Sequence, residues 1–407
     1  MTGNEVINEI KSYEEKIIED RRYLRAHPET GFDLKETVAY VKKQLEDMGY
    51  DVMQCGKAGL IVLAGGKKPG KVFLIRGDMD ALPVAEDTDL DFKSENGRMH
   101  ACGHDMHTAM LLGAARYLKN HESDINGTIK LMFQPAEEIF QGADDMIGAG
   151  VLDKPEVDAA MMIHVSAATP METGSVVVCS GGVSAAAADT FTITVKGKGC
   201  HGSTPSAGID PVSASAHIIM ALQEIHGREL GINEKAALTV GSIQGGIAAN
   251  VIPDSVVMKG TIRTFDEETR QMIKERLVDI ATGTAKVFRA EAEVVFDSGC
   301  PTLYNDSGLA EDTLKYSVEL LSDKRAFSMG MFTQSGNSRK NASAGSEDFA
   351  YVSQQIPSIM VALAAGKPDD GYCYPQHNPR VKFDEKALVN GTAVYVYNAM
   401  RWLEEHN

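Results

Sequence analysis

The sequence is poor in cysteine, in positive charge and in long apolar runs. Its 407 residues include six cysteines, and no two of them have the CxxC spacing of a zinc ribbon or a redox motif. No apolar stretch approaches the ~18 residues of a membrane span, and the first residues, MTGNEVINEIKSYEEK, lack the apolar core of a secretory signal. The net charge of −17 disfavours nucleic acid and anionic membranes as partners. We therefore expect a cytoplasmic protein with reduced thiols.

What is present is the composition of a globular protein. Hydrophobic residues make up 43% and charged residues 24% of the 407 positions, enough for more than one domain. In the first part, short continuous apolar runs alternate with helical patterns, which favours strands buried on both faces of a mostly parallel α/β sheet. The expected elements are a helix at 34–49, strands at 59–65, 71–82, 127–138 and 157–165, and a helix beginning at Asp105.

The pattern changes near residue 182. The stretch SGGVSAAAAD is rich in small residues and has the character of a hinge. After it the order strand, helix, strand, strand, helix, strand is that of a ferredoxin-like domain, and the α/β pattern then resumes. We predict a larger domain of residues 1–182 and 298–407 with a smaller domain of residues 183–297 inserted in it. The expected elements are strands at 190–197, 236–244, 255–265, 291–297 and 358–366 and helices at 211–226, 267–288, 307–323 and 385–405.

One short stretch, MHACGHDMH, concentrates metal-binding side chains. It places His100, Cys102, His104 and His107 within eight residues, just before an apolar helical run. Cysteine and histidine are ligands of borderline metals. Cys102 and His104 cannot share a helix face, so we expect both in the turn before the helix, with Asp105 as its N-cap. The spacing alone leaves open a metal site or a polar loop beside a buried cysteine.

Three other segments carry residues that suit a metal. FQPAEE puts Glu137 and Glu138 after an apolar strand, AMMIHV ends on His164, and YCYPQHNP carries His377 in a loop. Each has an ordinary alternative, namely a solvated carboxylate pair, a core histidine and a loop histidine. Residues that follow parallel strands converge at the carboxyl edge of the sheet, where ligands bind. Adjacent glutamates point different ways, so one can ligate a metal while its neighbour works on a bound water.

Eight motifs follow one another across nearly the whole chain: RRYLRAHPETGF (21–32), RGDMDALPV (76–84), MHACGHDMHTAMLLGAA (99–115), FQPAEE (133–138), GCHGSTPSAGIDPV (199–212), GGIAANVIPD (245–254), GTIRTF (260–265) and GSEDFAY (345–351). In this order they resemble the metal-dependent amidohydrolases that include hippurate hydrolases, N-acyl-amino-acid amidohydrolases and auxin-conjugate hydrolases, within the aminoacylase and carboxypeptidase superfamily. The resemblance implies a mostly parallel-sheet α/β catalytic domain with an inserted ferredoxin-like α+β lid and dimerisation domain. It also implies Glu137 as general base. The implied metal ligands are Cys102, His104, Glu138, His164 and His377.

The chain departs from the family pattern in two places. Leu24-Arg25 stands where the first motif usually reads Leu-His, and the surroundings of His377, CYPQHNPRVKFDE, differ from the usual Leu-His with a downstream Asp-Phe. In addition, Asp78 occupies a position at which distant relatives carry a metal-binding histidine. We interpret Asp80 as a second carboxylate that orients a ligand, with a structural aspartate at a strand end as the alternative.

In the inserted domain the resemblance marks three residues. His201 would stabilise the developing oxyanion in a partner's active site. Asn250 and Arg263 would hold the free carboxylate of the substrate, which suits the bidentate fork of arginine. Each has an ordinary loop or strand residue as its alternative. The segment from Gly345 to Asp348 is either a substrate-pocket loop or a helix N-cap.

The residues and the resemblance together predict metal-dependent hydrolysis of the amide bond of N-acyl amino acids or related conjugates. Two divalent metal ions, zinc with manganese, cobalt or nickel as alternatives, would activate a water beside Glu137. The expected partners are a small substrate with a free carboxylate and a second copy of the chain, bound through the inserted domain in a homodimer or higher homo-oligomer. The alternatives are a dipeptidase, a deacetylase of an N-acetyl biosynthetic intermediate, a non-catalytic metal-binding homologue, and a thiol redox protein using Cys102, for which no resolving cysteine is nearby.

Overall fold

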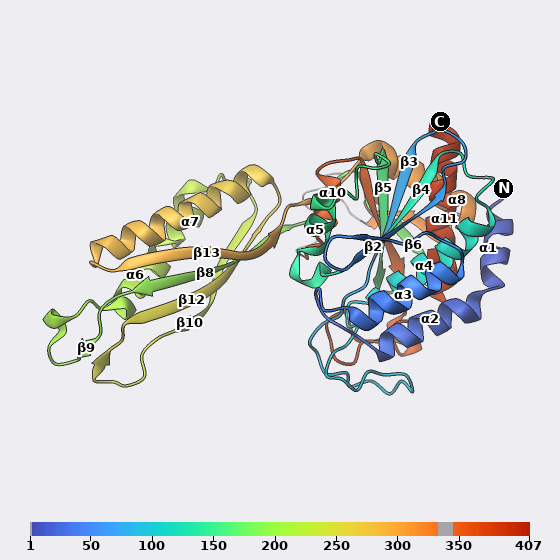
Figure 1. Cartoon of the computed structure of the whole chain (residues 1–407). Helices are drawn as coiled ribbons and strands as arrows, with labels where there is room; N and C mark the ends of the chain where they lie inside the picture. The colour runs from blue at the N-terminus through green and yellow to red at the C-terminus, as the bar shows by residue number, and fades with distance from the viewer. Residues whose placement is uncertain (1, 333–344) are drawn as a thin grey trace. The chain divides into compact units, whose positions relative to one another are not determined.

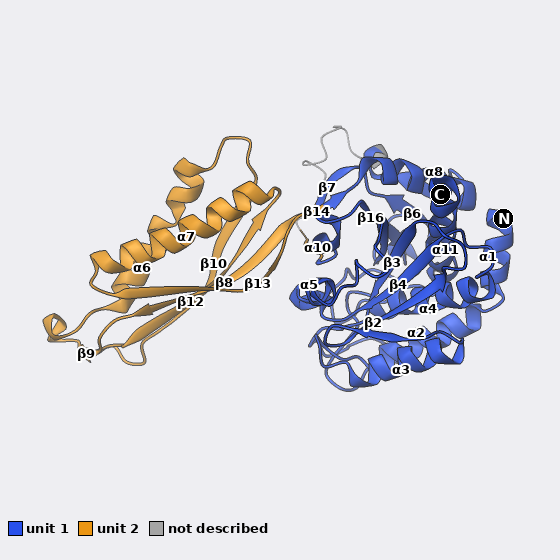
Figure 2. Cartoon of the chain, turned by 45° about the horizontal axis from the view of Figure 1, so that its top comes forward, with its two compact units in different colours: residues 1–184, 304–341, 348–407 blue, residues 185–303, 342–347 orange. Residues whose placement is uncertain are grey.

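The computed structural model describes residues 2–332 and 345–407, which form two compact units (Figure 2). Unit 1 comprises residues 1–184, 304–341 and 348–407, and unit 2 comprises residues 185–303 and 342–347. The chain passes between them at β7 (Gly182–Ala185) and β14 (Leu303–Asn305), which pair with each other, and again between Glu347 and Asp348. The domain limits expected from the sequence, after residues 182 and 297, remain a prediction.

Unit 1 is built on an eight-stranded sheet in the order β1-β2-β4-β3-β5-β16-β6-β15. Four of its seven pairings are parallel, so the mostly parallel α/β class is confirmed. Every residue of β3 is buried, and all but the first of β4, as continuous apolar runs predict. The strands are β1 (Met53–Cys55), β2 (Gly59–Gly65), β3 (Val72–Asp78), β4 (Thr128–Gln134), β5 (Ala159–Ser166), β6 (Val176–Val178), β15 (Ala326–Ser328) and β16 (Ser358–Ala364).

The helices of unit 1 surround this sheet (Figure 1). The two N-terminal helices, α10, β1, β6 and β15 were not predicted, and the strands expected at 71–82 and 127–138 end earlier, at Asp78 and Gln134. The shortened strands leave polar loop residues at the carboxyl edge of the sheet. The helices are α1 (Gly3–Lys11), α2 (Glu14–Ala26), α3 (Lys35–Asp47), α4 (His104–Asn120), α5 (Gly142–Gly148), α8 (Ser307–Leu321), α10 (Ala350–Ser353) and α11 (Ala387–His406).

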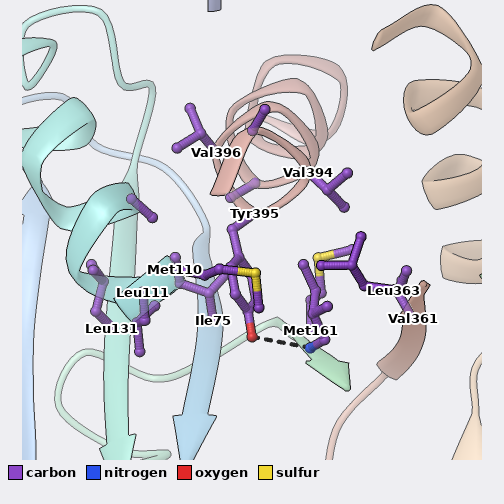
Figure 3. Close-up of a cluster of buried hydrophobic side chains, with 14 of the residues drawn as sticks. Ile75, Met110, Leu111, Leu131, Met161, Val361, Leu363, Val394, Tyr395 and Val396 are labelled. Carbon is purple, nitrogen blue, oxygen red and sulfur yellow. Dashed lines mark hydrogen bonds between the residues drawn. The ribbon is translucent and has the colours of Figure 1, made fainter. Parts of the chain in front are cut away.

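The core beneath the site lies where α4 and α11 pack against β3 and its neighbours (Figure 3). Met110 of α4 and Tyr395 of α11 belong to one cluster of buried side chains with the apolar residues of the strands. The Tyr395 hydroxyl donates a hydrogen bond to the Arg76 carbonyl (2.6 Å) and accepts one from the Ile163 amide (3.0 Å). The C-terminal helix therefore fixes β3 and β5 just before these strands reach their carboxyl ends.

Unit 2 is a four-stranded antiparallel sheet in the order β10-β12-β8-β13. Helices α6 and α7 cover one face (Figure 1), so the ferredoxin-like order is confirmed. The helix expected at 211–226 ends at Ala221 and is followed by a π-helical turn. The ribbon of β9 and β11 was not predicted. The elements are β8 (Ala187–Lys196), β9 (Cys200–His201), α6 (Pro211–Ala221), β10 (Ala236–Gln244), β11 (Val251–Ile252), β12 (Ser255–Thr264), α7 (Glu267–Val287) and β13 (Glu291–Cys300). Within the described residues, no helix has the length and apolarity needed to cross a membrane.

Candidate metal centre

The predicted ligand His164, the predicted general base Glu137 and Asp78 come from the ends of three neighbouring strands. Asp78 is the last residue of β3, Glu137 begins a short 3-10 turn just after β4, and His164 lies near the end of β5. The three strands run parallel in the order β4-β3-β5. Parallel strands end at one edge, so these side chains converge there, beside the first residue of α4.

A glycine turn places Cys102 and His104 at this edge. Gly103 is the N-cap residue of α4 and has a φ of 99°, a conformation that glycine adopts without strain. A Cβ atom on Gly103 would collide with the side chains of Val165 and Phe383. The predicted N-cap role of Asp105 is therefore wrong, because the helix has no side-chain cap and begins one residue earlier.

Cys102, His104 and His164 form the first group of candidate ligand atoms, all within 4.8 Å of one another. Cys102 Sγ lies 3.5 Å from His164 Nε2. The Nδ1 atom of each histidine lies within hydrogen-bond distance of a backbone carbonyl, that of Asp80 for His104 (2.9 Å) and that of Val165 for His164 (2.7 Å). A proton on Nδ1 in each ring leaves both Nε2 atoms able to bind a metal.

Cys102 also belongs to a second group, with Glu138 and His377, that meets the same 4.8 Å limit. His377 Nε2 lies 3.8 Å from a Glu138 carboxylate oxygen. The loop of His377 is held by its own backbone amide, which donates to the Ala101 carbonyl at 2.9 Å. His377 has a positive φ of 66°, so this loop adopts a strained conformation to present its imidazole.

The Glu137-Glu138 turn is held by Asp80. The two oxygens of the buried Asp80 carboxylate accept the backbone amides of Glu137 (3.0 Å) and Glu138 (3.2 Å). Glu137 is 5% exposed, and its carboxylate lies 3.8 Å from His104 Nε2. Asp80 therefore orients residues on both sides of the site, His104 through its carbonyl and the glutamates through its carboxylate.

The other two histidines of the MHACGHDMH stretch lie outside these two groups, although His107, Asp78 and His104 also have candidate ligand atoms within 4.8 Å of one another. His107 Nδ1 lies 2.6 Å from an Asp78 carboxylate oxygen, and His107 Nε2 accepts the Val165 amide at 2.9 Å. Both its ring nitrogens are thus occupied. His100 is fully buried, and burial lowers its pKa to about 3. His107 therefore links the end of β3, through Asp78, to the backbone of β5.

The electrostatics of the cluster suit a bound cation. Burial raises the pKa of the Cys102 thiol to about 12 and lowers the pKa of His164 to about 3. Burial also acts to lower the pKa of His104, but the Asp78 and Cys102 charges raise it well above its usual value. Within the described residues, the buried His104 Nε2 atom makes no hydrogen bond. A buried polar atom without a partner is costly, and a divalent metal would both satisfy it and stabilise the thiolate.

Sequence reasoning missed the buried network under the site. The Asp348 carboxylate accepts from Arg76 Nη2 (3.0 Å), Gln134 Nε2 (2.7 Å) and the Ala143 amide (3.0 Å). Arg76 also donates to Asp78 at 2.7 Å. The available signal was a charged residue inside the apolar strand KVFLIRGD. The N-cap residue of α10 is Phe349, which lies beyond the segment 345–348, so the N-cap alternative is wrong.

The other marked residues lie in unit 2. His201 of β9 pairs with Val251 of β11, and the amide of the residue after His201 bonds to the Asn250 carbonyl, so these residues are neighbours. Arg263 lies on β12 and donates to the Thr261 hydroxyl at 2.6 Å. The Gly345 carbonyl accepts the amide of residue 186 at 3.1 Å. The substrate contacts of these residues remain predictions.

The sequence model of peptidase family M20/M25/M40 matches residues 74–401. The chain belongs to this family. It is 34% identical to the N-acetyl-L-cysteine deacetylase of Bacillus subtilis over 100% of this chain and 94% of that relative. It is 38% identical to the N-acyl-L-amino acid amidohydrolase of Geobacillus stearothermophilus over 76% of this chain and 83% of that relative.

A solved structure gives the same result for the fold. The crystal structure of a dinuclear metal-binding peptidase of the M20 family from Bacillus subtilis matches with a TM-score of 0.76 and 32% identity. The match covers 97% of this chain and 99% of the other. The family resemblance carried by the motifs is therefore confirmed.

Proposed function

We propose that this chain is a metal-dependent amidohydrolase that cleaves the amide bond of N-acyl amino acids or related conjugates. The observation that carries the proposal is the pair of candidate ligand groups that share Cys102, with the Glu137 carboxylate beside them. Thiolate, imidazole and carboxylate together suit two divalent metals, with zinc as the first choice and manganese, cobalt or nickel as alternatives. A reducing cytoplasm would keep Cys102 available as a ligand.

Glu137 is the residue that would move the proton. A divalent metal held by these residues would lower the pKa of a coordinated water and polarise an amide carbonyl. Glu137 takes up a proton from the water and delivers it to the amine nitrogen as the carbon–nitrogen bond breaks, so that amide and water become carboxylate and amine. The Asp80 carboxylate holds the backbone of Glu137 (3.0 Å) and thereby keeps its carboxylate at the edge of the ligand groups.

The substrate contacts are proposed to involve two copies of the chain. His201 and Asn250 lie at the ribbon end of unit 2, whereas Arg263 lies near the opposite end of β12, which begins at Ser255. A strand rises about 3.3 Å per residue, so Arg263 is roughly 25 Å from the ribbon end. One copy cannot bring all three to one substrate. This separation supports a homodimer in which the oxyanion donor His201 and the carboxylate anchor Arg263 come from different protomers.

A substrate panel tests the proposal. The purified protein is loaded with Zn²⁺ or Mn²⁺ and assayed on N-acetyl, N-benzoyl and long-chain N-acyl amino acids, their carboxamide analogues, and dipeptides. We expect hydrolysis of N-acyl amino acids and at least tenfold weaker kcat/KM for the carboxamides, which lack the anionic group. Faster hydrolysis of dipeptides would favour the dipeptidase alternative, and no hydrolysis by metal-loaded protein would contradict the proposal.

A further inference from the structure

Helix α2 carries two buried arginines on one face. Arg21 and Arg25 are four residues apart, a spacing that places both side chains on the same side of a helix. Their side chains are 1% and 0% exposed. Burying two cations in neighbouring turns is costly unless each is fully engaged, so their partners indicate what the pair does.

Arg25 joins two segments that carry candidate ligands. Its Nη1 atom donates to the His100 carbonyl (2.8 Å), two residues before Cys102, and its Nη2 atom donates to the Val381 carbonyl (3.0 Å), four residues after His377. Its Nε and Nη2 atoms also donate to one Glu86 oxygen, at 3.1 and 2.8 Å. The Glu86 side chain is itself 0% exposed, so this ion pair is shielded from water.

Arg21 makes a similar but less complete set of contacts one turn earlier, since its buried Nη2 atom has no hydrogen-bond partner among the described residues. Its Nε atom donates to Asp105 (2.8 Å), the residue after His104. Its Nη1 atom donates to Glu385 (3.0 Å), in the segment that leads from the His377 loop into α11. Both arginines therefore connect the cysteine turn on one side with the His377 segment on the other.

We infer that this arginine clamp, Arg21 and Arg25, sets the distance between the Cys102 turn and the His377 segment and so completes the second ligand group. The inference rests on the proposed function. His377 needs such support because its side chain is 56% exposed and no helix or strand carries it. The first group depends less on the clamp, because His104 and His164 belong to α4 and β5. Arg21 and Arg25 are thus positioning residues.

The test is metal binding by Arg25→Met, Arg25→Lys and Lys130→Met. Lys130 is a matched control, since it is also fully buried and donates to two backbone carbonyls, of Val151 (2.7 Å) and Pro155 (2.8 Å), but joins no ligand segment. Metal-free proteins are titrated calorimetrically with Mn²⁺ and with Zn²⁺, and bound metal is counted after dialysis. Exchange of backbone amides in peptides covering residues 99–107 and 374–385 is measured in parallel.

We expect Arg25→Met to retain one metal and to bind the other about 10- to 100-fold more weakly, the usual cost of losing an outer-shell partner. Faster amide exchange should be confined to the two ligand segments. Arg25→Lys keeps the charge but loses the planar guanidinium with its several donors. Its affinity for the second metal should therefore lie between those of Arg25→Met and the unaltered protein. Lys130→Met should lose stability and keep both metals.

The clamp is refuted if Arg25→Met, or Arg25→Lys should the first variant not fold, binds both metals with unaltered affinity. It is equally refuted if Lys130→Met loses the same metal, because the effect would then be a general loss of stability. An unaltered protein that binds no metal would overturn the proposed function itself, and the clamp with it. Metal binding by the unaltered protein therefore distinguishes failure of the clamp from failure of the proposed function.

Discussion

The Asp80 carboxylate offers a direct test of how the site is held. Each of its oxygens accepts one backbone amide of the glutamate turn, from Glu137 at 3.0 Å and from Glu138 at 3.2 Å. Asp80→Asn keeps the size of the side chain but replaces one acceptor oxygen with an amino group. One of the two amides then faces a donor and is left buried without a partner.

The size of the effect follows from that single lost acceptor. A buried amide without a partner costs about 1–3 kcal/mol, and we expect the free energy of unfolding of unit 1 to fall by about that amount. The loss acts on the turn that carries Glu137 and Glu138, so turnover should also fall. Since each 1.4 kcal/mol corresponds to a factor of ten in rate, kcat should drop roughly 5- to 150-fold.

The chain provides its own probe for this measurement. Its single tryptophan, Trp402, lies in α11 and is 6% exposed, so its fluorescence reports on the unfolding of unit 1 in denaturant. Asp306→Asn is the matched control, because Asp306 accepts one backbone amide, that of Leu309 at 2.8 Å, and asparagine caps a helix equally well. The reasoning is refuted if Asp80→Asn unfolds at the same denaturant concentration as the control and keeps its kcat within twofold.

Three further outcomes are expected. Cys102→Ser should lose metal from both ligand groups, whereas Cys179→Ser, at another buried thiol, should keep it; metal analysis after dialysis separates the two. Arg263→Ala should raise KM roughly 10- to 100-fold for substrates with a free carboxylate and leave KM unchanged for their carboxamides. Burial acts to lower the pKa of His121, but the hydrogen bonds that its ring donates to the Asp124 and Glu9 carboxylates raise the pKa. This ion pair therefore stabilises the metal-free fold below pH ~6.5 and loses its effect as the pH rises through the raised pKa, so His121→Gln should flatten the stability–pH curve there by less than about 1 kcal/mol.

Residues whose role follows from nearby sequence were predictable. The spacing of Cys102 and His104 excluded a shared helix face and so indicated a turn, which Gly103 provides. The apolar runs before Glu137 and His164 indicated parallel strands, and parallel strands bring their carboxyl ends together. The order of strands and helices in unit 2 indicated its topology in the same way.

Residues whose partners are distant in sequence were not predictable from local pattern. Asp105 is of a residue type that often caps helices, yet its carboxylate accepts a hydrogen bond from Arg21, 84 residues earlier. Arg25 has no local feature that distinguishes it from a surface arginine of an amphipathic helix, and its partners lie 61 to 356 residues away. His107 lies in the same sequence stretch as Cys102, but its two ring nitrogens form hydrogen bonds with Asp78 and with the Val165 amide. Such choices depend on tertiary packing.

The central claim is that Glu137 transfers the proton at the metal centre but is not required for metal binding. The most direct measurement compares metal content and turnover of N-acyl amino acids for the unaltered protein and Glu137→Ala. The account predicts that both hold two metal ions and that turnover by the variant falls by about 10²- to 10⁴-fold. A variant that keeps both its metal and its rate, or an unaltered protein that binds no metal, would contradict the account.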